Sequence, residues 1–360
     1  MKVPALNCVS LLLLLQAPAS PADIVASLFA PATGTPQRPS AVVGFVVDGK
    51  ADVKAFGRLT VPTAATPSHV PTADTLYEIG SITKALTGIV LADMALAGEV
   101  SLHDTLDRFL PEPPNFPEAV RKITLLQLAT HSSGLPRLPG NLMQSVKDPS
   151  NPYANYGRAE LEAYLRSYAP PAGRTTITPE YSNLGFGLLG HILATKAGMP
   201  YEALLKARVL DPLGMKDTSI ALSDAQRKRL APGHARGAAV SNWDIDALAG
   251  AGAVRSSAAD MTLLLKALMQ PPDSRIGKAI RLAIEPRAQI GAAKIGLGWL
   301  TSTPPAGSPF TWHNGGTGGY RSFIGFTPDG KAGIVVLTNG ADQSPDPLGI
   351  AALQRLAAGR

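Results

Sequence analysis

Apolar runs of strand length lie near both ends of this chain. They cover residues 41–47, 322–327 and 333–338, and a shorter run near 53–57 follows the turn Asp48-Gly49. A further turn, Pro328-Asp329-Gly330, separates the last two runs. Short apolar or alternating runs joined by Asp-Gly turns are typical of β-hairpins. The two ends of the chain are therefore expected to build a sheet.

Helices are predicted between these runs. From Ser81 to Leu96 nearly every residue is apolar or small, and Gly98 follows as a C-terminal stop. A helix that is apolar all round is a buried helix. Strands at both ends with helices between them predict an α/β fold, in which a mixed, mainly antiparallel sheet is flanked by helices and carries a large helical insertion. Further helices are expected near 159–168, 201–209, 258–268 and 347–358.

The first nineteen residues resemble a secretory signal peptide (1–19). Lys2 precedes a leucine-rich run, and the small residues Ala17-Pro18-Ala19 follow as a cleavage site. The apolar run is too short to span a bilayer. We expect export, most simply to the periplasm, with a mature chain beginning near Ser20. The remainder is expected to be a flexible segment over 20–40 and one domain over 41–360, with sheet regions 41–80 and 270–360 and a mainly helical region 81–269.

Composition narrows the classes of function. The 360 residues are 45% hydrophobic, enough for a large core. The net charge of +6 is spread along the chain without a basic run interleaved with aromatic residues, which argues against nucleic-acid binding. The single cysteine, Cys8, lies in the predicted signal, so no disulfide is expected. The histidines have no metal-binding spacing, and we expect no metal or organic cofactor.

Ser81 and Lys84 are the first candidates for chemistry. Three residues apart, they share one face of the first turn of the predicted helix. Burial lowers the pKa of an amine, so Lys84 could accept the proton of a nucleophilic Ser81. The alternative is that Ser81 only caps the helix while Lys84 extends to water.

Two later segments supply further candidates. Tyr181-Ser182-Asn183 follows Pro179 and begins an apolar helix, so that the phenol of Tyr181 lies on a loop at a helix start. Trp312-His313-Asn314-Gly315-Gly316-Thr317 precedes the C-terminal hairpin, and its glycines suit a strand edge along which a ligand backbone lies close. Each segment alone could be purely structural.

Together and in this order, the three segments resemble the serine β-lactamase and penicillin-binding-protein superfamily. The Tyr-x-Asn second motif is similar to that of the class C β-lactamases and related D,D-peptidases, among them periplasmic carboxypeptidase/endopeptidase relatives. The resemblance extends from about residue 40 to the C-terminus. It implies catalytic roles for Ser81, Lys84 and Tyr181, and it implies that Asn183, His313, Gly315, Gly316 and Thr317 bind the substrate.

One position departs from the family's pattern. His313 occupies the place of the lysine in Lys-Thr-Gly, which in the classical enzymes helps to bind the substrate carboxylate. A histidine is mostly uncharged at neutral pH. Arg321, after the glycine-rich strand, could replace that contact or be a surface charge, and both remain open. His131, in Thr130-His131-Ser132, is expected to stabilise a turn rather than to act as a base.

The sequence thus predicts a secreted serine hydrolase that cleaves amide bonds, either of a β-lactam or of a D-alanyl peptide of peptidoglycan, through an acyl-serine intermediate. The partner is a small-molecule or peptide substrate. An esterase or D-aminopeptidase on the same fold and a non-catalytic penicillin-binding-like sensor remain alternatives. The sequence leaves the choice of substrate and the oligomeric state open.

Overall fold

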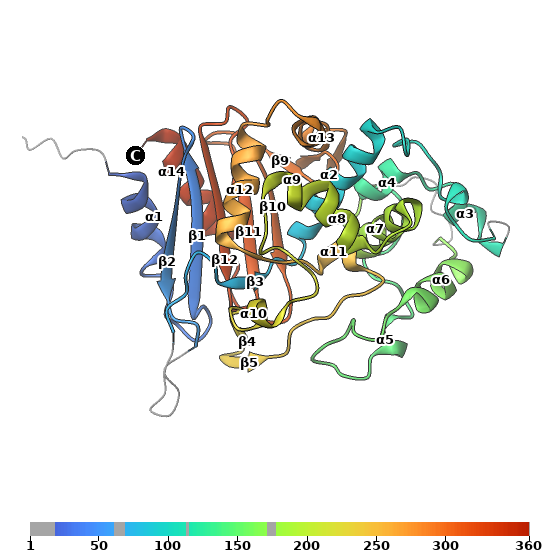
Figure 1. Cartoon of the computed structure of the whole chain (residues 1–360), viewed down its shortest axis with the longest axis horizontal. Coiled ribbons are helices and arrows are strands. Elements are labelled where there is room, and N and C mark those ends of the chain that lie inside the picture. Colours follow the sequence, from blue (N-terminus) through green and yellow to red (C-terminus); the bar gives the residue numbers. More distant parts are fainter. Residues whose placement is uncertain (1–18, 61–68, 113–114, 171–177, 360) are drawn as a thin grey trace, which may run out of the picture.

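A computed structural model describes residues 19–60, 69–112, 115–170 and 178–359. All but the last residue of the predicted signal lies outside these ranges. Figure 1 shows a tall sheet on one side of the molecule and a group of helices on the other, with α2 (Ile82–Leu96) between them.

The sheet has eight strands in the order β2-β1-β12-β11-β10-β9-β8-β7, and neighbouring strands are antiparallel. Strand β1, from the N-terminal part, pairs with β12, from the C-terminal part, and these are the second and third strands of this order. The prediction that both chain ends build one sheet is confirmed. Its strands are β1 (Ser40–Val47), β2 (Lys50–Gly57), β7 (Ala288–Ile290), β8 (Ala293–Ile295), β9 (Leu300–Ser302), β10 (Phe310–Gly316), β11 (Arg321–Phe326) and β12 (Ala332–Thr338).

Helices cover both faces of the sheet, which explains the continuous apolar runs. In β1, Val42 and Val46 join the core beneath α2 and α12 (Ala258–Met269), while Val43 and Phe45 join a second core beneath α1 and α14. Successive strand residues point to opposite faces, so a strand buried on both sides must be apolar at nearly every position.

Short segments complete the architecture. Two small sheets pair β3 (Leu76–Glu78) with β6 (Arg255–Ser257), and β4 (Gly233–Ala235) with β5 (Ala238–Val240). The other helical segments are α1 (Pro21–Phe29), η1 (Leu106–Arg108), α3 (Glu118–Arg121), α4 (Leu125–Ala129), α5 (Leu142–Ser145), α6 (Arg158–Ser167), α7 (Asn183–Ala197), α8 (Tyr201–Leu205), η3 (Lys206–Leu210), α9 (Asp211–Leu213), α10 (Asp224–Arg227), α11 (Ala249–Gly252), α13 (Arg275–Ile284) and α14 (Asp346–Ala358).

Two expectations about organisation need correction. The segment 20–40 is not simply flexible, because residues 21–29 form α1, which buries Val25 and Phe29 against the sheet. Ser20 caps this helix in a reciprocal hydrogen-bonded arrangement with Asp23. The sheet region 270–360 also contains helix α13, which packs on α2.

Glycines let the helices around α2 approach closely. A Cβ atom on Gly190 of α7 would lie 2.8 Å from Cα of Gly250 in α11, so the two backbones are in direct contact. A Cβ on Gly88 of α2 would lie 1.8 Å from the carbonyl oxygen of Leu297. Side chains at these positions would separate the segments that surround the start of α2.

We predict that Gly88→Ala destabilises the protein although alanine favours helices. Overpacking a rigid backbone contact costs roughly 1–3 kcal/mol, which exceeds the gain of about 1 kcal/mol in helix propensity. Urea unfolding measures the change. Gly140→Ala, in an exposed turn, is the control for the added methyl group alone, because a Cβ there would meet only a side-chain atom at 3.4 Å. Equal stability of both variants would contradict the close contact at Gly88.

Candidate active site

Ser81 lies at a strand–turn–helix junction beside the edge of the sheet. Strand β3 leads through Gly80, at φ 50°, to Ser81, the N-cap of α2. A Cβ on Gly80 would lie 2.5 Å from the backbone nitrogen of Gly316, and one on Gly315 would lie 2.0 Å from the carbonyl oxygen of Ile79. The glycines therefore bring the backbone of β10 directly against the turn that carries Ser81.

Lys84 is fully buried beneath Ser81. Its Nζ lies 2.9 Å from Ser81 Oγ and donates to the carbonyl oxygen of Ala251 at 2.7 Å. Burial, with a smaller contribution from the positive charge of Arg137, holds the pKa of Lys84 well below its usual value of 10.5. The amine is thus favoured in its neutral form, which can accept a proton from the hydroxyl.

Tyr181 lies on the other side of Ser81. Burial raises the pKa of its phenol to about 12, and a hydrogen bond with Ser81 and the charge of Arg137 oppose this rise. The Nζ of Lys84 lies 4.9 Å from the centre of the tyrosine ring, and Cζ of Arg137 lies 5.0 Å from it. The structure therefore brings together Ser81, Lys84 and Tyr181 from separate parts of the chain.

The first turn of α7 holds Asn183 near this group. Ser182 is the N-cap and accepts from the N–H of Gly185 at 2.9 Å, while the N–H of Asn183 donates to the carbonyl of Arg137 at 2.9 Å. Asn183 and Ser81 both line a small cavity of about 30 Å³.

A larger cavity of about 520 Å³ opens above Ser81. Ser81, Tyr181, Gly315, Gly316 and Thr317 line it, so the glycine-rich edge of β10 forms one of its walls. A hydroxyl, a phenol and a strand edge at one cavity, with a neutral amine beneath the hydroxyl, form a site suited to acyl transfer through a serine ester.

Comparison with known proteins agrees with this geometry. A family model described as Beta-lactamase matches residues 25–359. The chain belongs to the Beta-lactamase family. It is a serine hydrolase of the serine β-lactamase and penicillin-binding-protein superfamily, which confirms the resemblance drawn from the three motifs.

The relatives of this Beta-lactamase family member include proteins named as β-lactamases and proteins named as carboxypeptidase/endopeptidases. "Beta-lactamase" of Escherichia coli (strain K12) is 27% identical over 352 residues, covering 88% of each chain. "D-alanyl-D-alanine-carboxypeptidase/endopeptidase AmpH" of the same organism is 32% identical over 283 residues, covering 74% of this chain and 71% of AmpH. A solved class C β-lactamase from Rhodobacter sphaeroides has a TM-score of 0.78 and 25% identity, over 93% of this chain and 98% of that one.

His313 does not lie where a direct contact to substrate would require. Its side chain is 1% exposed and lines neither cavity beside Ser81. Burial, with a contribution from Lys84, lowers the pKa of His313 to about 3, and its Nδ1 lies 2.6 Å from the carbonyl oxygen of Asn314. The imidazole is therefore neutral and set behind the strand edge, which argues against the expected direct contact between His313 and a substrate carboxylate.

His131 supports the loop that carries Tyr181. Its carbonyl accepts from the N–H of Glu180 at 2.9 Å, and its Nδ1 accepts from the N–H of Ser182 at 3.0 Å. The ring centres of His131 and Tyr181 are 4.5 Å apart. These contacts fix both neighbours of Tyr181, and they agree with the expectation that His131 stabilises a turn. Its φ of 57°, uncommon for a residue other than glycine, shows how firmly this turn is held.

Sequence reasoning missed several residues that line the larger cavity, including two with large side chains. Arg137 comes from the loop after α4, and Trp243 comes from the loop before α11. Neither belongs to one of the three motifs, and only the folded chain brings them beside Ser81. The residue left open in the sequence, Arg321, lines the same cavity.

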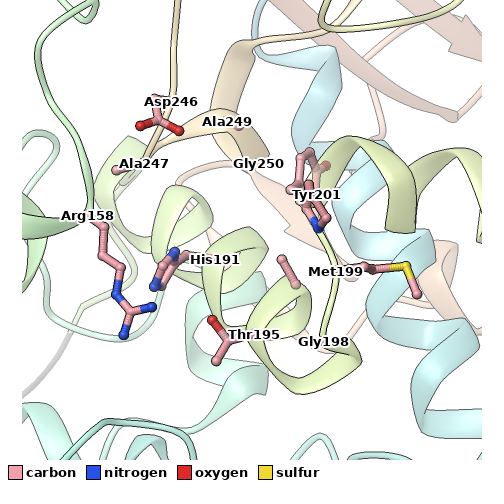
Figure 2. Close-up of a pocket in the computed structure, with 12 residues that line it drawn as sticks. Arg158, His191, Thr195, Gly198, Met199, Tyr201, Asp246, Ala247, Ala249 and Gly250 are labelled. Carbon is pink, nitrogen blue, oxygen red and sulfur yellow. The ribbon is translucent and has the colours of Figure 1, made fainter.

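A separate cavity of about 450 Å³ lies between α7 and α11 (Figure 2). Arg158, His191 and Asp246 are among its lining residues, and it contains no serine–lysine pair. Within the described ranges, no group of three or more His, Cys, Asp or Glu side chains could hold a metal ion, and no helix is long and apolar enough to cross a membrane.

We predict that Lys84→Met raises the free energy of unfolding at pH 7. The native state holds Lys84 neutral, whereas the unfolded state protonates it up to a pKa near 10.5, so unfolding takes up a proton at neutral pH. Wild-type stability should therefore rise between pH 7 and 9 relative to the variant. Urea titrations across this range measure the difference.

Lys50→Met is the matched control for this test, since Lys50 is exposed on β2. It should leave the pH dependence of stability as in the wild type. If Lys84→Met also left that dependence unchanged, the amine of Lys84 would be charged in the folded protein.

Proposed function

We propose that this protein is a secreted enzyme that hydrolyses amide bonds, of a β-lactam or of a D-alanyl peptide of peptidoglycan, through an acyl-Ser81 intermediate. The observation that carries the proposal is the buried amine of Lys84, 2.9 Å from the hydroxyl of Ser81 at the base of an open cavity. The printed names of the relatives, a β-lactamase and a D-alanyl-D-alanine-carboxypeptidase/endopeptidase, support these two substrate classes.

In the first step, Ser81 Oγ attacks the carbonyl carbon of the substrate. Lys84, with Tyr181, takes up the hydroxyl proton, which is why a neutral amine is required. The tetrahedral intermediate then breaks its bond to nitrogen, and the leaving amine receives a proton from Tyr181 or Lys84. The acyl group remains as an ester of Ser81.

Backbone and side-chain groups around Ser81 are suited to bind the reacting carbonyl. The N–H groups of Ser81 and Gly316 would donate to the developing oxyanion, and the near contact between Gly80 and Gly316 brings these backbones together. Asn183 would orient the substrate amide and Lys84. Gly315 and Thr317 would lie along the substrate backbone.

The second step hydrolyses the ester. Tyr181 would relay a proton from water to the neutral amine of Lys84 while the water oxygen attacks the acyl carbon, and the proton returns to Ser81 Oγ as the ester bond breaks. The products are a carboxylic acid and the free serine. No step requires a metal or an organic cofactor.

An esterase or D-aminopeptidase is the second candidate function. It is favoured by His313, because a buried neutral imidazole offers no positive charge where the classical enzymes have a lysine. A non-catalytic sensor is less well supported, since such a role would not require a buried, neutral Lys84 against Ser81. Export rests on the predicted signal over residues 1–19, and the periplasm is the proposed location.

We predict that a fluorophosphonate or a penicillin adds its mass to Ser81. Ser81→Ala should abolish labelling and lower hydrolysis by at least about a thousandfold, since the covalent route is lost. Intact-mass spectrometry after parallel incubation with a penicillin, a D-Ala-D-Ala peptide and a nitrophenyl ester measures both the site and the preferred substrate. Ser132→Ala, at a nearby turn outside the two cavities, is the control. Labelling that persists in Ser81→Ala would contradict the assignment.

We also predict that titration of His313 does not affect the rate of hydrolysis between pH 5 and 8. Its pKa of about 3 keeps the imidazole neutral over this range. His313→Gln should therefore change the rate without changing the shape of the profile for anionic or neutral esters. A decline of kcat/KM near pH 6.5 that affects only anionic esters and disappears in His313→Gln would show that His313 binds the carboxylate as an imidazolium.

A further inference from the structure

The separate cavity of Figure 2 shares a wall with the catalytic site. Its volume of about 450 Å³ is large enough for a small ligand. Ala249 and Gly250 of α11 line it. The next residue, Ala251, lines the small cavity beside Ser81 and accepts from Nζ of Lys84. The short helix α11 therefore contributes to the walls of both cavities.

Buried hydrogen bonds also join this separate cavity to α2. The phenol oxygen of Tyr201, which lines the cavity, lies 2.6 Å from Oγ1 of Thr87. The same Oγ1 donates to the carbonyl oxygen of Gly250 at 2.7 Å. Thr87 follows Lys84 by three residues in α2, so one turn of this helix carries both the catalytic amine and the hydrogen-bonded link. A movement of Tyr201 or Gly250 would therefore be felt at the carbonyl of Ala251.

Polar and apolar side chains lie on different sides of this cavity. Figure 2 shows Arg158, His191 and Asp246 to the left of the view. Met199 and Tyr201 lie to the right. A ligand that uses both sides has polar groups at one end and a small apolar part at the other.

The polar side offers charges of both signs. Nε of Arg158 bonds to Glu162 at 2.6 Å, and its two terminal nitrogens have no hydrogen-bond partner among the described residues. Asp246 is exposed, and its carboxylate forms no ion pair or hydrogen bond within the described part of the chain. A guanidinium binds a carboxylate through charge-assisted hydrogen bonds, and a carboxylate binds an ammonium group in the same way.

His191 gives an independent indication of a polar ligand. Its imidazole is half-buried and has no hydrogen-bond partner in the described ranges. Burial and the charge of Arg158 lower the pKa of His191, although Glu162 and Asp246 oppose this shift. The neutral ring has one donor and one acceptor to offer. A polar group that is partly withdrawn from water is stabilised when a ligand completes its hydrogen bonding.

We propose that this cavity binds the zwitterion of an amino acid or short peptide, with its carboxylate on Arg158 and its ammonium group on Asp246, and that the occupant acts on the catalytic amine through α11. His191 would bond to a polar group of the ligand, and the small side chain would pack on Met199 and Tyr201. The site does not depend on the proposed function, whereas its effect on the rate does. Hydrolysis of a D-alanyl peptide would release a compound of this class.

Calorimetric titration measures binding after Ser81 has been blocked with a fluorophosphonate, so that only the separate cavity is open. D-Alanine and D-alanyl-D-alanine are the probes, and they distinguish an amino acid from a peptide. N-acetyl-D-alanyl-D-alanine lacks the ammonium group, and D-alanyl-D-alanine amide lacks the carboxylate. We expect at least one zwitterion to bind with a Kd of about 1 mM or below, and the two modified dipeptides to bind about tenfold more weakly than the dipeptide zwitterion.

Substitutions assign each charge to its partner. Arg158→Gln should weaken zwitterion binding about tenfold and remove the preference for a free carboxylate. Asp246→Asn should weaken it similarly and remove the preference for a free ammonium group. Arg166→Gln, on the same helix, and the exposed Asp273→Asn are the matched controls, because neither residue lines the cavity. Both controls should leave the Kd unchanged.

The effect on the catalytic amine is measured with unblocked enzyme and the neutral substrate 4-nitrophenyl acetate. Saturation with the tighter zwitterion should raise kcat by about twofold or more, because the ligand supports the helix whose carbonyl accepts from Lys84. Tyr201→Phe removes only the phenol oxygen that bonds to Thr87. It should abolish the rise in kcat while changing the Kd by less than about twofold.

The outcomes separate this inference from the proposed function. If neither zwitterion binds the blocked enzyme, or if the modified dipeptides bind as tightly as the dipeptide zwitterion, the site is overturned. Binding without a change in kcat would overturn the link to Lys84. If the fluorophosphonate does not label Ser81, the proposed function fails. The same titrations of the unblocked chain and of Arg158→Gln then still decide whether the site exists.

Discussion

The site depends on one constraint, the exclusion of water from the amine of Lys84. An ammonium ion at this position would be stabilised by water, and without water the neutral form is favoured. The apolar surface of α2 and the carbonyl of Ala251 create this environment. The close contact of α7 with α11 holds that carbonyl in place, which is why glycines occur at positions 190 and 250. The packing of the helical region therefore also keeps the amine of Lys84 in its neutral form.

A second requirement is that the sheet and the helices meet without side chains between them. Gly80 and Gly315 meet this requirement, because any Cβ would collide with the opposing backbone. The turn that carries Ser81 is thereby placed against β10, and the cavity opens along the same strand edge. The eight-stranded sheet gives β10 a fixed register with β11, so Gly316 lies opposite Arg321. Pairing of the two chain ends in the sheet thus helps to define the wall of the active site.

Neutral and charged basic groups lie at different depths in this site. The buried groups Lys84, His131 and His313 all have pKa values lowered by burial, so each favours its neutral form. The permanent positive charge lies nearer the surface, on guanidinium groups that do not lose it at neutral pH. Neutral groups thus lie deep in the site, and charged groups lie nearer its opening.

The sequence by itself determined the main strands and the helix after Ser81, and it pointed to the three motifs as candidates for chemistry. Continuous apolar runs identified β1, β11 and β12, and the uninterrupted apolar stretch from Ser81 identified α2, because these patterns follow from local geometry and burial on both faces. The tertiary structure alone decided how side chains distant in the chain meet. It placed Arg137 and Trp243 beside Ser81, set His313 behind the strand edge, and made residues 21–29 of the segment expected to be flexible a packed helix. Exposure and proximity depend on which surfaces face each other, and one-dimensional spacing does not contain that information.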